Sequence, residues 1–238
     1  MVRAMFPTTH WSVVAEATLS GTPDGRAALA ALCEEYRPPI LAFLRGRGFA
    51  EEDAQDVTQD FFLRLLDSRA WSRADRARGR FRTFLLGVLT HTLQHRAAHG
   101  GAQKRGAGAT TASLNEMADA GFEPADATSE MGENFAREWA WSLVERATFE
   151  TEQRYAGNGN AAEFSVLRYF LPGAPATLTY SDAMSRLRLS ETALKAAVHR
   201  LRQAFRERLR AAVAKTVSAP HEVDEEMRYL QEVLGRAT

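Results

Sequence analysis

The chain has 238 residues, and its 30 basic and 30 acidic side chains give a formal net charge of zero. This length favours two domains of about 100 residues each. The sequence lacks an apolar run near the roughly 20 residues that a membrane-spanning helix requires. Its single cysteine, Cys33, excludes an internal disulfide and any multi-cysteine metal site. We therefore expect a cytoplasmic protein without membrane insertion or redox chemistry.

The zero net charge conceals a strong segregation of charge along the chain. Cations dominate residues 64–105 and again residues 186–215, whereas the charged side chains of residues 115–134 are all acidic. Basic blocks of this kind attract polyanions such as nucleic acid. The pattern predicts two contacts with nucleic acid, separated by an acidic segment.

Long segments repeat apolar residues with the helical period, and no strand-like period appears, so we predict an all-α protein. The first helical domain is expected at residues 24–100, after an N-terminal extension at residues 1–23. Pro38-Pro39 and the glycines near Arg47 are expected to break its helices. The helices predicted in this domain are 27–36, 40–47, 53–66 and 80–98.

Residues 101–134 are predicted to form a flexible acidic linker. Glycines and other small residues interrupt the helical period here, and the acidic stretch that follows contains few apolar side chains. The linker would join the first domain to a second helical domain at residues 135–215.

The second domain ends in two short helical patterns joined at Arg188-Leu189-Ser190. Thr179 and Asp182 have the spacing of a capping box for the first pattern, and Ser190 can cap the second. This arrangement predicts a helix-turn-helix whose second helix enters a major groove of DNA. The apolar positions of the second helix form a stripe that should be buried: Leu194, Ala197, Val198, Leu201, Phe205, Leu209, Ala212 and Val213.

Cations lie off this stripe at the same three-and-four spacing: Lys195, His199, Arg202, Arg206 and Arg210. In a groove, such side chains would face bases and phosphates together. A basic helix at a solvated protein surface would show a similar run. The two-helix pattern favours DNA.

Residues 216–238 form a C-terminal helical extension with an acidic start. Its narrow apolar stripe contains Val223, Met227, Leu230 and Leu234. This stripe fits against the second domain of the same chain or against another protein. One hypothesis is that the extension docks on the helix-turn-helix and masks it.

The predicted helix at residues 53–66, DAQDVTQDFFLRLL, has Asp56, Gln59 and Asp60 on its polar side and is expected to bury Phe62, Leu65 and Leu66. It resembles the core-polymerase-binding helix of bacterial RNA polymerase sigma factors. GRFRTFLLGVLTHTLQHRAAH resembles the following helix of the same sigma domain, and TYSDAMSRLRLSETALKAAVHRL resembles the helix-turn-helix of the carboxy-terminal sigma domain. The order of these segments, with no domain between them, is similar to the extracytoplasmic-function (ECF) class of the sigma-70 family.

The resemblance implies a transcription initiation factor, not an enzyme, that binds core RNA polymerase, directs it to promoter DNA and assists melting. The residues implied in polymerase binding are Asp56, Gln59, Asp60 and Phe62. Those implied at the downstream promoter element are Arg76, Arg78, Arg80, Phe81, Arg82, His91, His95 and Arg96. Those implied at the upstream element are Ser190, Thr192, Lys195, His199, Arg200, Arg202 and Arg206. No cofactor or metal is implied, and regulation by an inhibitory anti-sigma partner or by the C-terminal extension is left open.

The turn of the helix-turn-helix departs from the family pattern, and the N-terminal segment and the tail after Lys215 lie outside its common two-domain plan. Arg188 stands where the family often has glycine, so a left-handed turn there would cost about 1 kcal/mol. His91, His95 and His99 stand four residues apart, but the third rotates away from the first on a helix. We expect these histidines to face nucleic acid or solvent rather than a metal ion.

Two other classes of protein remain as alternatives. A free-standing helix-turn-helix regulator would bind DNA without core polymerase. An adaptor that captures another regulator would use the same helices without DNA. Salt-sensitive DNA binding separates the adaptor from the other two, and polymerase binding separates a sigma factor from a regulator.

Overall fold

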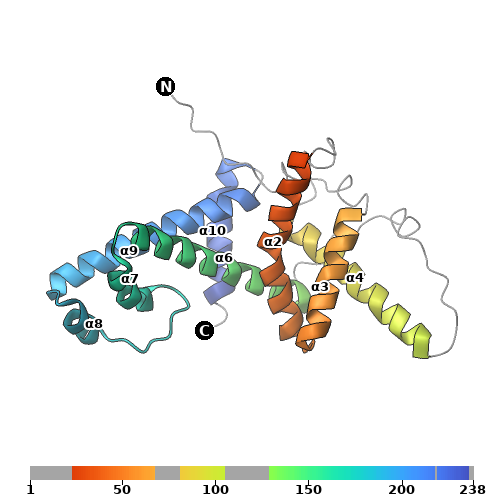
Figure 1. The fold of residues 1–238 in the computed structure, drawn as a ribbon, viewed down its shortest axis with the longest axis horizontal. Coiled ribbons are helices and arrows are strands. Elements are labelled where there is room, and N and C mark those ends of the chain that lie inside the picture. Colours follow the sequence, from red (N-terminus) through yellow and green to blue (C-terminus); the bar gives the residue numbers. More distant parts are fainter. Residues whose placement is uncertain (1–22, 68–80, 105–128, 218, 236–238) are drawn as a thin grey trace, which may run out of the picture.

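The computed structural model describes residues 23–67, 81–104, 129–217 and 219–235. All regular structure in these residues is helical (Figure 1), which confirms the prediction of an all-α protein. The α-helices are α2 (Pro23–Gly46), α3 (Glu51–Asp67), α4 (Phe81–Lys104), α6 (Glu130–Gly157), α7 (Ala161–Leu167), α8 (Tyr180–Leu187), α9 (Glu191–Thr216) and α10 (Val223–Gly235). Two single 3-10 turns, η3 (Arg168–Phe170) and η4 (Pro220–Glu222), precede α8 and α10.

Helix α2 continues through Pro38 and Pro39, so the predicted break at these prolines is wrong. An interior proline removes a backbone donor and costs a helix about 3 kcal/mol or more. The apolar face of α2 explains the outcome, because Tyr36, Ile40 and Phe43 are buried at helical spacing on both sides of the prolines. Burial of one continuous stripe offsets the lost hydrogen bonds.

Helices α3 and α4 pack beside α2 at one end of the molecule (Figure 1). The aromatic residue that α3 buries fully is Phe61, not Phe62 as expected. Phe62 is partly buried and lies against Phe61, with ring centroids 5.0 Å apart. The buried stripe of α3 is Ala54, Val57, Phe61 and Leu65.

The helices on both sides of the predicted linker extend into it. Residues 101–104 belong to α4 and residues 130–134 belong to α6, so the expected linker boundaries are wrong. Ser129 caps α6 by accepting a hydrogen bond from the Gly132 amide at 3.1 Å. Acidic residues in the first turn of α6 also suit the positive end of the helix dipole. Residues 105–128, and the predicted N-terminal extension up to residue 22, lie outside the described residues.

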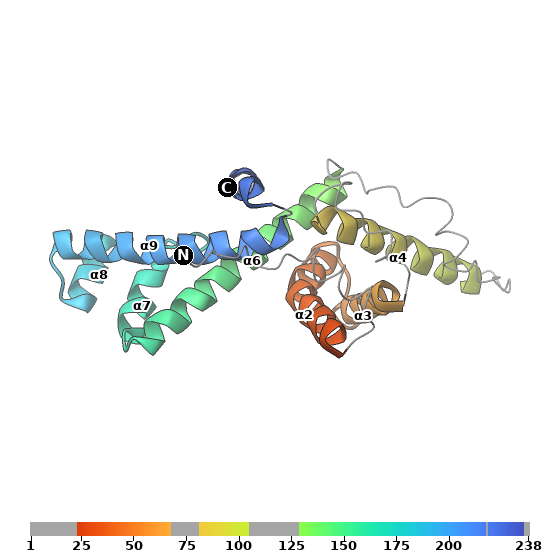
Figure 2. The same ribbon diagram turned by 90° about the horizontal axis from the view of Figure 1, so that it is seen from above.

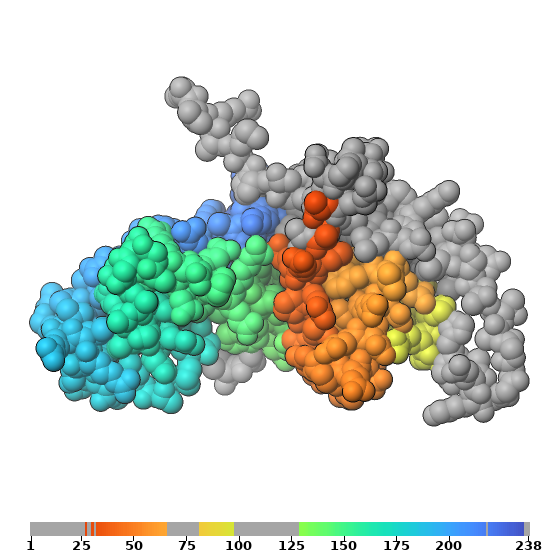
Figure 3. All heavy atoms as spheres, viewed as in Figure 1, coloured from red at the N-terminus to blue at the C-terminus, as the bar shows by residue number. Residues whose placement is uncertain are grey.

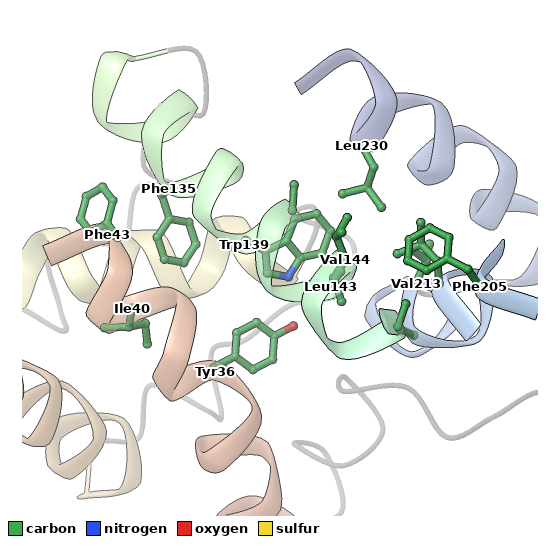
Figure 4. Close-up of a cluster of buried hydrophobic side chains, with 14 of the residues drawn as sticks. Tyr36, Ile40, Phe43, Phe135, Trp139, Leu143, Val144, Phe205, Val213 and Leu230 are labelled. Carbon is green, nitrogen blue, oxygen red and sulfur yellow. The ribbon is translucent and has the colours of Figure 1, made fainter. Parts of the chain in front are cut away.

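Helix α6 joins the two halves of the chain, since it packs on α2 and α4 near its start and on α7 and α9 beyond. Figure 2 shows its course between these two ends, and Figure 3 shows the surfaces of α2 and α6 in contact. Phe135 of α6 meets Phe43 of α2 edge to face, with centroids 5.5 Å apart, and Trp139 lies in the same cluster (Figure 4). The two halves therefore share one apolar core.

Helix α9 buries its predicted stripe. All eight apolar residues named from the sequence, from Leu194 to Val213, are buried in the structure. They pack mainly against α6, with α7 and α8 beside the first turns of α9. The prediction of this stripe is confirmed.

The C-terminal extension forms α10, which packs on α6 and α9 of the same chain. Its predicted stripe faces these helices, with Val223 and Leu230 buried. Glu226 on the same side is fully buried, which the sequence did not indicate. Ser190 and Lys195, at the start of α9, remain exposed. Helix α10 thus docks on α9, as the hypothesis holds, but it leaves the start of α9 exposed and does not mask it.

Candidate polymerase and nucleic-acid interfaces

The polar residues predicted on α3 share one exposed face. Asp56 and Gln59 are exposed, and Asp60 is partly buried. Leu63 continues this face one turn further and is 56% exposed. Sequence analysis missed it, although its spacing from Asp60 and Asp56, three and seven residues, places it on the same side of a helix. The face offers carboxylates, an amide and one apolar side chain to a partner.

Two side-chain pairs join this part of α3 to α4. Arg96 donates from Nη1 to Asp60 at 2.7 Å, and Arg64 Nη2 lies 2.9 Å from His95 Nδ1. The predicted polymerase carboxylate Asp60 and the predicted DNA cation Arg96 are thus brought together. Both side chains keep more than a third of their surface exposed, so each can still reach an outside partner.

Two residues predicted at the downstream element are withdrawn from the surface. Phe81 is 0% exposed and packs edge to face on Tyr36, with centroids 5.4 Å apart, so it belongs to the core and cannot stack on a base. Arg82 has a side chain only 13% exposed and is paired with Glu226 of α10. The assignment of Phe81 to DNA is therefore wrong, and Arg82 is occupied by Glu226 in this arrangement of the chain. Arg76, Arg78 and Arg80 lie outside the described residues.

His91 and His95 are partly buried on α4. Burial, and secondarily the nearby Arg64 charge, lower the pKa of His91 below its ordinary value. This imidazole is therefore biased toward its neutral form, in which one ring nitrogen donates and the other accepts.

Both helices of the helix-turn-helix are capped at their starts. Thr179 and Asp182 form the predicted capping box: the Thr179 hydroxyl accepts from the Asp182 amide at 3.2 Å, and the Thr179 amide donates to the Asp182 carboxylate at 3.2 Å. Hydrogen bonds from Thr179 hold the pKa of Asp182 below its ordinary value. Ser190 caps α9 by accepting from the Ala193 amide at 3.3 Å. Both capping predictions are confirmed.

Arg188 ends α8 in the left-handed region, with φ 53° and ψ 42°. It is the one non-glycine residue with positive φ among the described residues. A left-handed conformation costs a residue with a Cβ about 1–2 kcal/mol. This conformation lets the backbone turn from α8 into α9. The side chain of Arg188 is exposed.

The residues predicted at the upstream element all lie exposed on α9 or at its cap. Lys195 pairs with Glu191 at 2.6 Å, and this exposed pair costs little to exchange for a phosphate contact. Arg202 donates from Nε to the Phe170 carbonyl at 3.1 Å, so it also fastens the segment before α8. The exposed set is Ser190, Thr192, Lys195, His199, Arg200, Arg202 and Arg206.

Comparison with protein families gives one match on this chain. Residues 32–100, which include α3 and most of α2 and α4, match the family model described as Sigma-70 region 2. This segment, called the region 2 domain below, is similar to sigma-70 region 2. The match supports a relation to the sigma-70 family of sigma factors, which act in transcription initiation. No curated protein and no solved structure matches the chain.

The region 2 domain contains the exposed face of α3 and the Asp60–Arg96 pair. It implies roles in RNA polymerase binding and promoter melting, with core polymerase and promoter DNA as partners. Within the described ranges, no helix is long and apolar enough to cross a membrane. The same residues hold no cluster of three or more histidine, cysteine or carboxylate side chains fit for a metal ion.

Proposed function

We propose that the chain is an ECF-class sigma factor that acts in the cytoplasm and directs core RNA polymerase to promoters through two DNA contacts. The region 2 domain, within residues 24–100, would bind the polymerase and the downstream element. Residues 135–215 would bind the upstream element through α9. The observation that carries the proposal is the region 2 match over a segment whose α3 presents an open acidic face.

The polymerase contact is assigned to the exposed face of α3. Asp56, Gln59 and Asp60 would meet a basic surface through charge-assisted hydrogen bonds. Leu63 adds an apolar side chain at the edge of these charges, and interfaces often depend on such an anchor surrounded by polar contacts. Phe62 supports the face from beneath, where it packs on Phe61.

The upstream contact is assigned to the first turns of α9. Ser190 and Thr192 lie at the positive end of the helix dipole, where a phosphate is favoured. Lys195 and His199 follow one and two turns later on the exposed side. Hydrogen bonds to phosphate would position the helix, and contacts to base edges would specify the sequence.

The downstream contact is assigned to the exposed parts of α4. His91, His95 and Arg96 of the predicted set are partly exposed on α4, and the last two contact α3. An imidazole or guanidinium plane can support an unstacked base, and the cation also neutralises phosphate. The Arg96 pair with Asp60 would keep this group beside the polymerase face.

Co-purification with bacterial core RNA polymerase tests the proposal. The double variant Asp56→Arg plus Gln59→Arg reverses the charge of the α3 face and leaves the Asp60–Arg96 pair intact. Glu232→Arg, an exposed substitution on α10, is the matched control. We expect wild type and Glu232→Arg to bind the polymerase and the double variant to lose at least tenfold in affinity.

Failure of wild type to bind core polymerase would overturn the proposal. DNA binding that persists without polymerase would then identify a free-standing helix-turn-helix regulator. Equal polymerase binding by the wild type and the double variant would contradict the assignment to α3.

A further inference from the structure

Glu226 of α10 is an acidic residue inside the protein. Its side chain is 1% exposed, and it accepts a hydrogen bond from Arg82 Nη1 of α4. The two residues are 144 positions apart in the sequence. A charge this deeply buried is tolerated only with a hydrogen-bonded partner of opposite sign, so the position of α10 depends on Arg82.

The guanidinium of Arg82 is enclosed by groups from two other helices, α6 and α10. Its central carbon lies 4.8 Å from the ring centroid of Trp139 on α6 and 4.2 Å from that of Tyr229 on α10. Aromatic faces attract a cation most strongly where water is excluded. Arg82 is therefore engaged by protein groups in this arrangement, and only 13% of its side-chain surface stays exposed.

Apolar contacts and a second ion pair hold α10 beside this site. Val223 and Leu230 are buried, Leu230 beside the cluster of α6 and α9 side chains shown in Figure 4. Asp224 at the start of α10 pairs with Arg210 of α9. That pair is exposed and contributes little. Glu226 with Arg82 is a buried polar link from α10 to the region 2 domain.

A buried ion pair of this kind is suited to a switch. Its desolvation cost nearly cancels its attraction, so the pair adds little net stability, yet removing one partner strands the other charge. The pair thus fixes where α10 docks, but it adds little to the free energy that favours the docked position over the released one. A competing anion can displace the carboxylate if it compensates the same cation.

We propose that α10 is an internal latch: Glu226 holds Arg82 of the region 2 domain away from nucleic acid, and release of α10 makes Arg82 available to DNA phosphate. The proposal rests on the proposed function only in taking DNA as the ligand. It replaces the idea that the extension masks α9. The latch acts on Arg82 of α4, in the region 2 domain, and not on α9.

Hydrogen exchange of the full-length chain tests the docking of α10. Glu226→Gln removes the buried charge with almost no change in shape, and Glu226→Lys places two cations together. Glu232→Gln, an exposed position on the same helix, is the control. We expect exchange across α10 to be at least tenfold faster in both Glu226 variants and unchanged in Glu232→Gln, with α2 and α9 protected as in wild type. Wild-type exchange of α10 in both Glu226 variants would overturn the latch.

DNA binding tests what the latch controls. The probe is a short duplex with an unpaired central segment, titrated against the chain without polymerase. Glu226→Gln is expected to bind at least threefold more tightly than wild type or Glu232→Gln. The double variant Arg82→Ala plus Glu226→Gln is expected to lose this gain. Faster exchange without tighter binding, or a gain that survives loss of Arg82, would overturn the proposal.

These readouts separate the latch from the proposed function. Exchange and DNA binding are measured without polymerase. A chain that fails to bind core polymerase but shows both effects would therefore keep the latch and lose the sigma-factor assignment.

Discussion

Arg96 of α4 donates a hydrogen bond to Asp60 of α3 at 2.7 Å, although 36 residues separate them. The first belongs to the surface proposed for DNA and the second to the surface proposed for polymerase. Their side chains are 37% and 42% exposed, so solvent screens the pair and partners can compete for either member. The surfaces proposed for polymerase and for DNA therefore meet at one ion pair.

The first prediction concerns the contribution of this pair to folding. Asp60→Asn removes the charge that Arg96 contacts, and we expect the free energy of unfolding to fall by less than about 1 kcal/mol, as for other exposed ion pairs. Asp56→Asn, on the same helix face, is expected to leave it unchanged. Urea denaturation measures both. A loss of several kcal/mol in Asp60→Asn would contradict the exposed, screened character of the pair.

The second prediction concerns the turn of the helix-turn-helix. Arg188 adopts φ 53°, a conformation that glycine adopts without steric cost. Arg188→Gly is expected to raise the free energy of unfolding by about 1 kcal/mol. Arg186→Gly, in the last turn of α8, is the control and should lower it by about 0.5–1 kcal/mol. Thermal or urea unfolding distinguishes the two signs, and a loss of stability in Arg188→Gly would contradict the left-handed turn.

The third prediction concerns salt dependence of DNA binding. Arg206 is exposed on α9, and each phosphate contact contributes about 0.9 to the slope of log affinity against log salt. Arg206→Ala is expected to reduce that slope by about one. Arg37→Ala, exposed on α2, should leave it unchanged. Arg202 is less suitable, because it also donates to the Phe170 carbonyl. Fluorescence anisotropy at several salt concentrations gives both slopes, and an equal effect of the two variants would contradict the assignment to α9.

Local signals explain what the sequence predicted correctly. The caps at Thr179 and Ser190 involve groups only three residues apart, and the stripe of α9 follows the helical period. The exposed face of α3 follows from the same period. For α3, the sequence predicted burial of Phe62, whereas the structure buries Phe61. Two adjacent aromatic residues do not show which of them lies at the centre of the buried stripe.

Long-range packing explains what the sequence did not predict. Pro38 and Pro39 are helix breakers by local chemistry, and only the core that α2 shares with its neighbours keeps the helix intact. In the sequence, Arg82 looks like any other cation of the basic block, because its partner Glu226 lies far away in α10. Glu226 likewise resembles one more acid at the start of the tail. Pairing over 144 residues leaves no local pattern to detect.

The last prediction concerns pH. Burial first, and then Arg64, lower the pKa of His91 below its ordinary value of 6.5. The unfolded chain therefore binds a proton at His91 more readily than the folded chain. By linkage, the contribution of this residue to stability is fully present above about pH 6.5 and declines as the pH falls through that value. We expect His91→Gln to lose less stability than wild type between pH 7.5 and pH 5.5. Urea denaturation of both proteins at the two pH values measures the difference, and an equal decline would contradict a depressed pKa at His91.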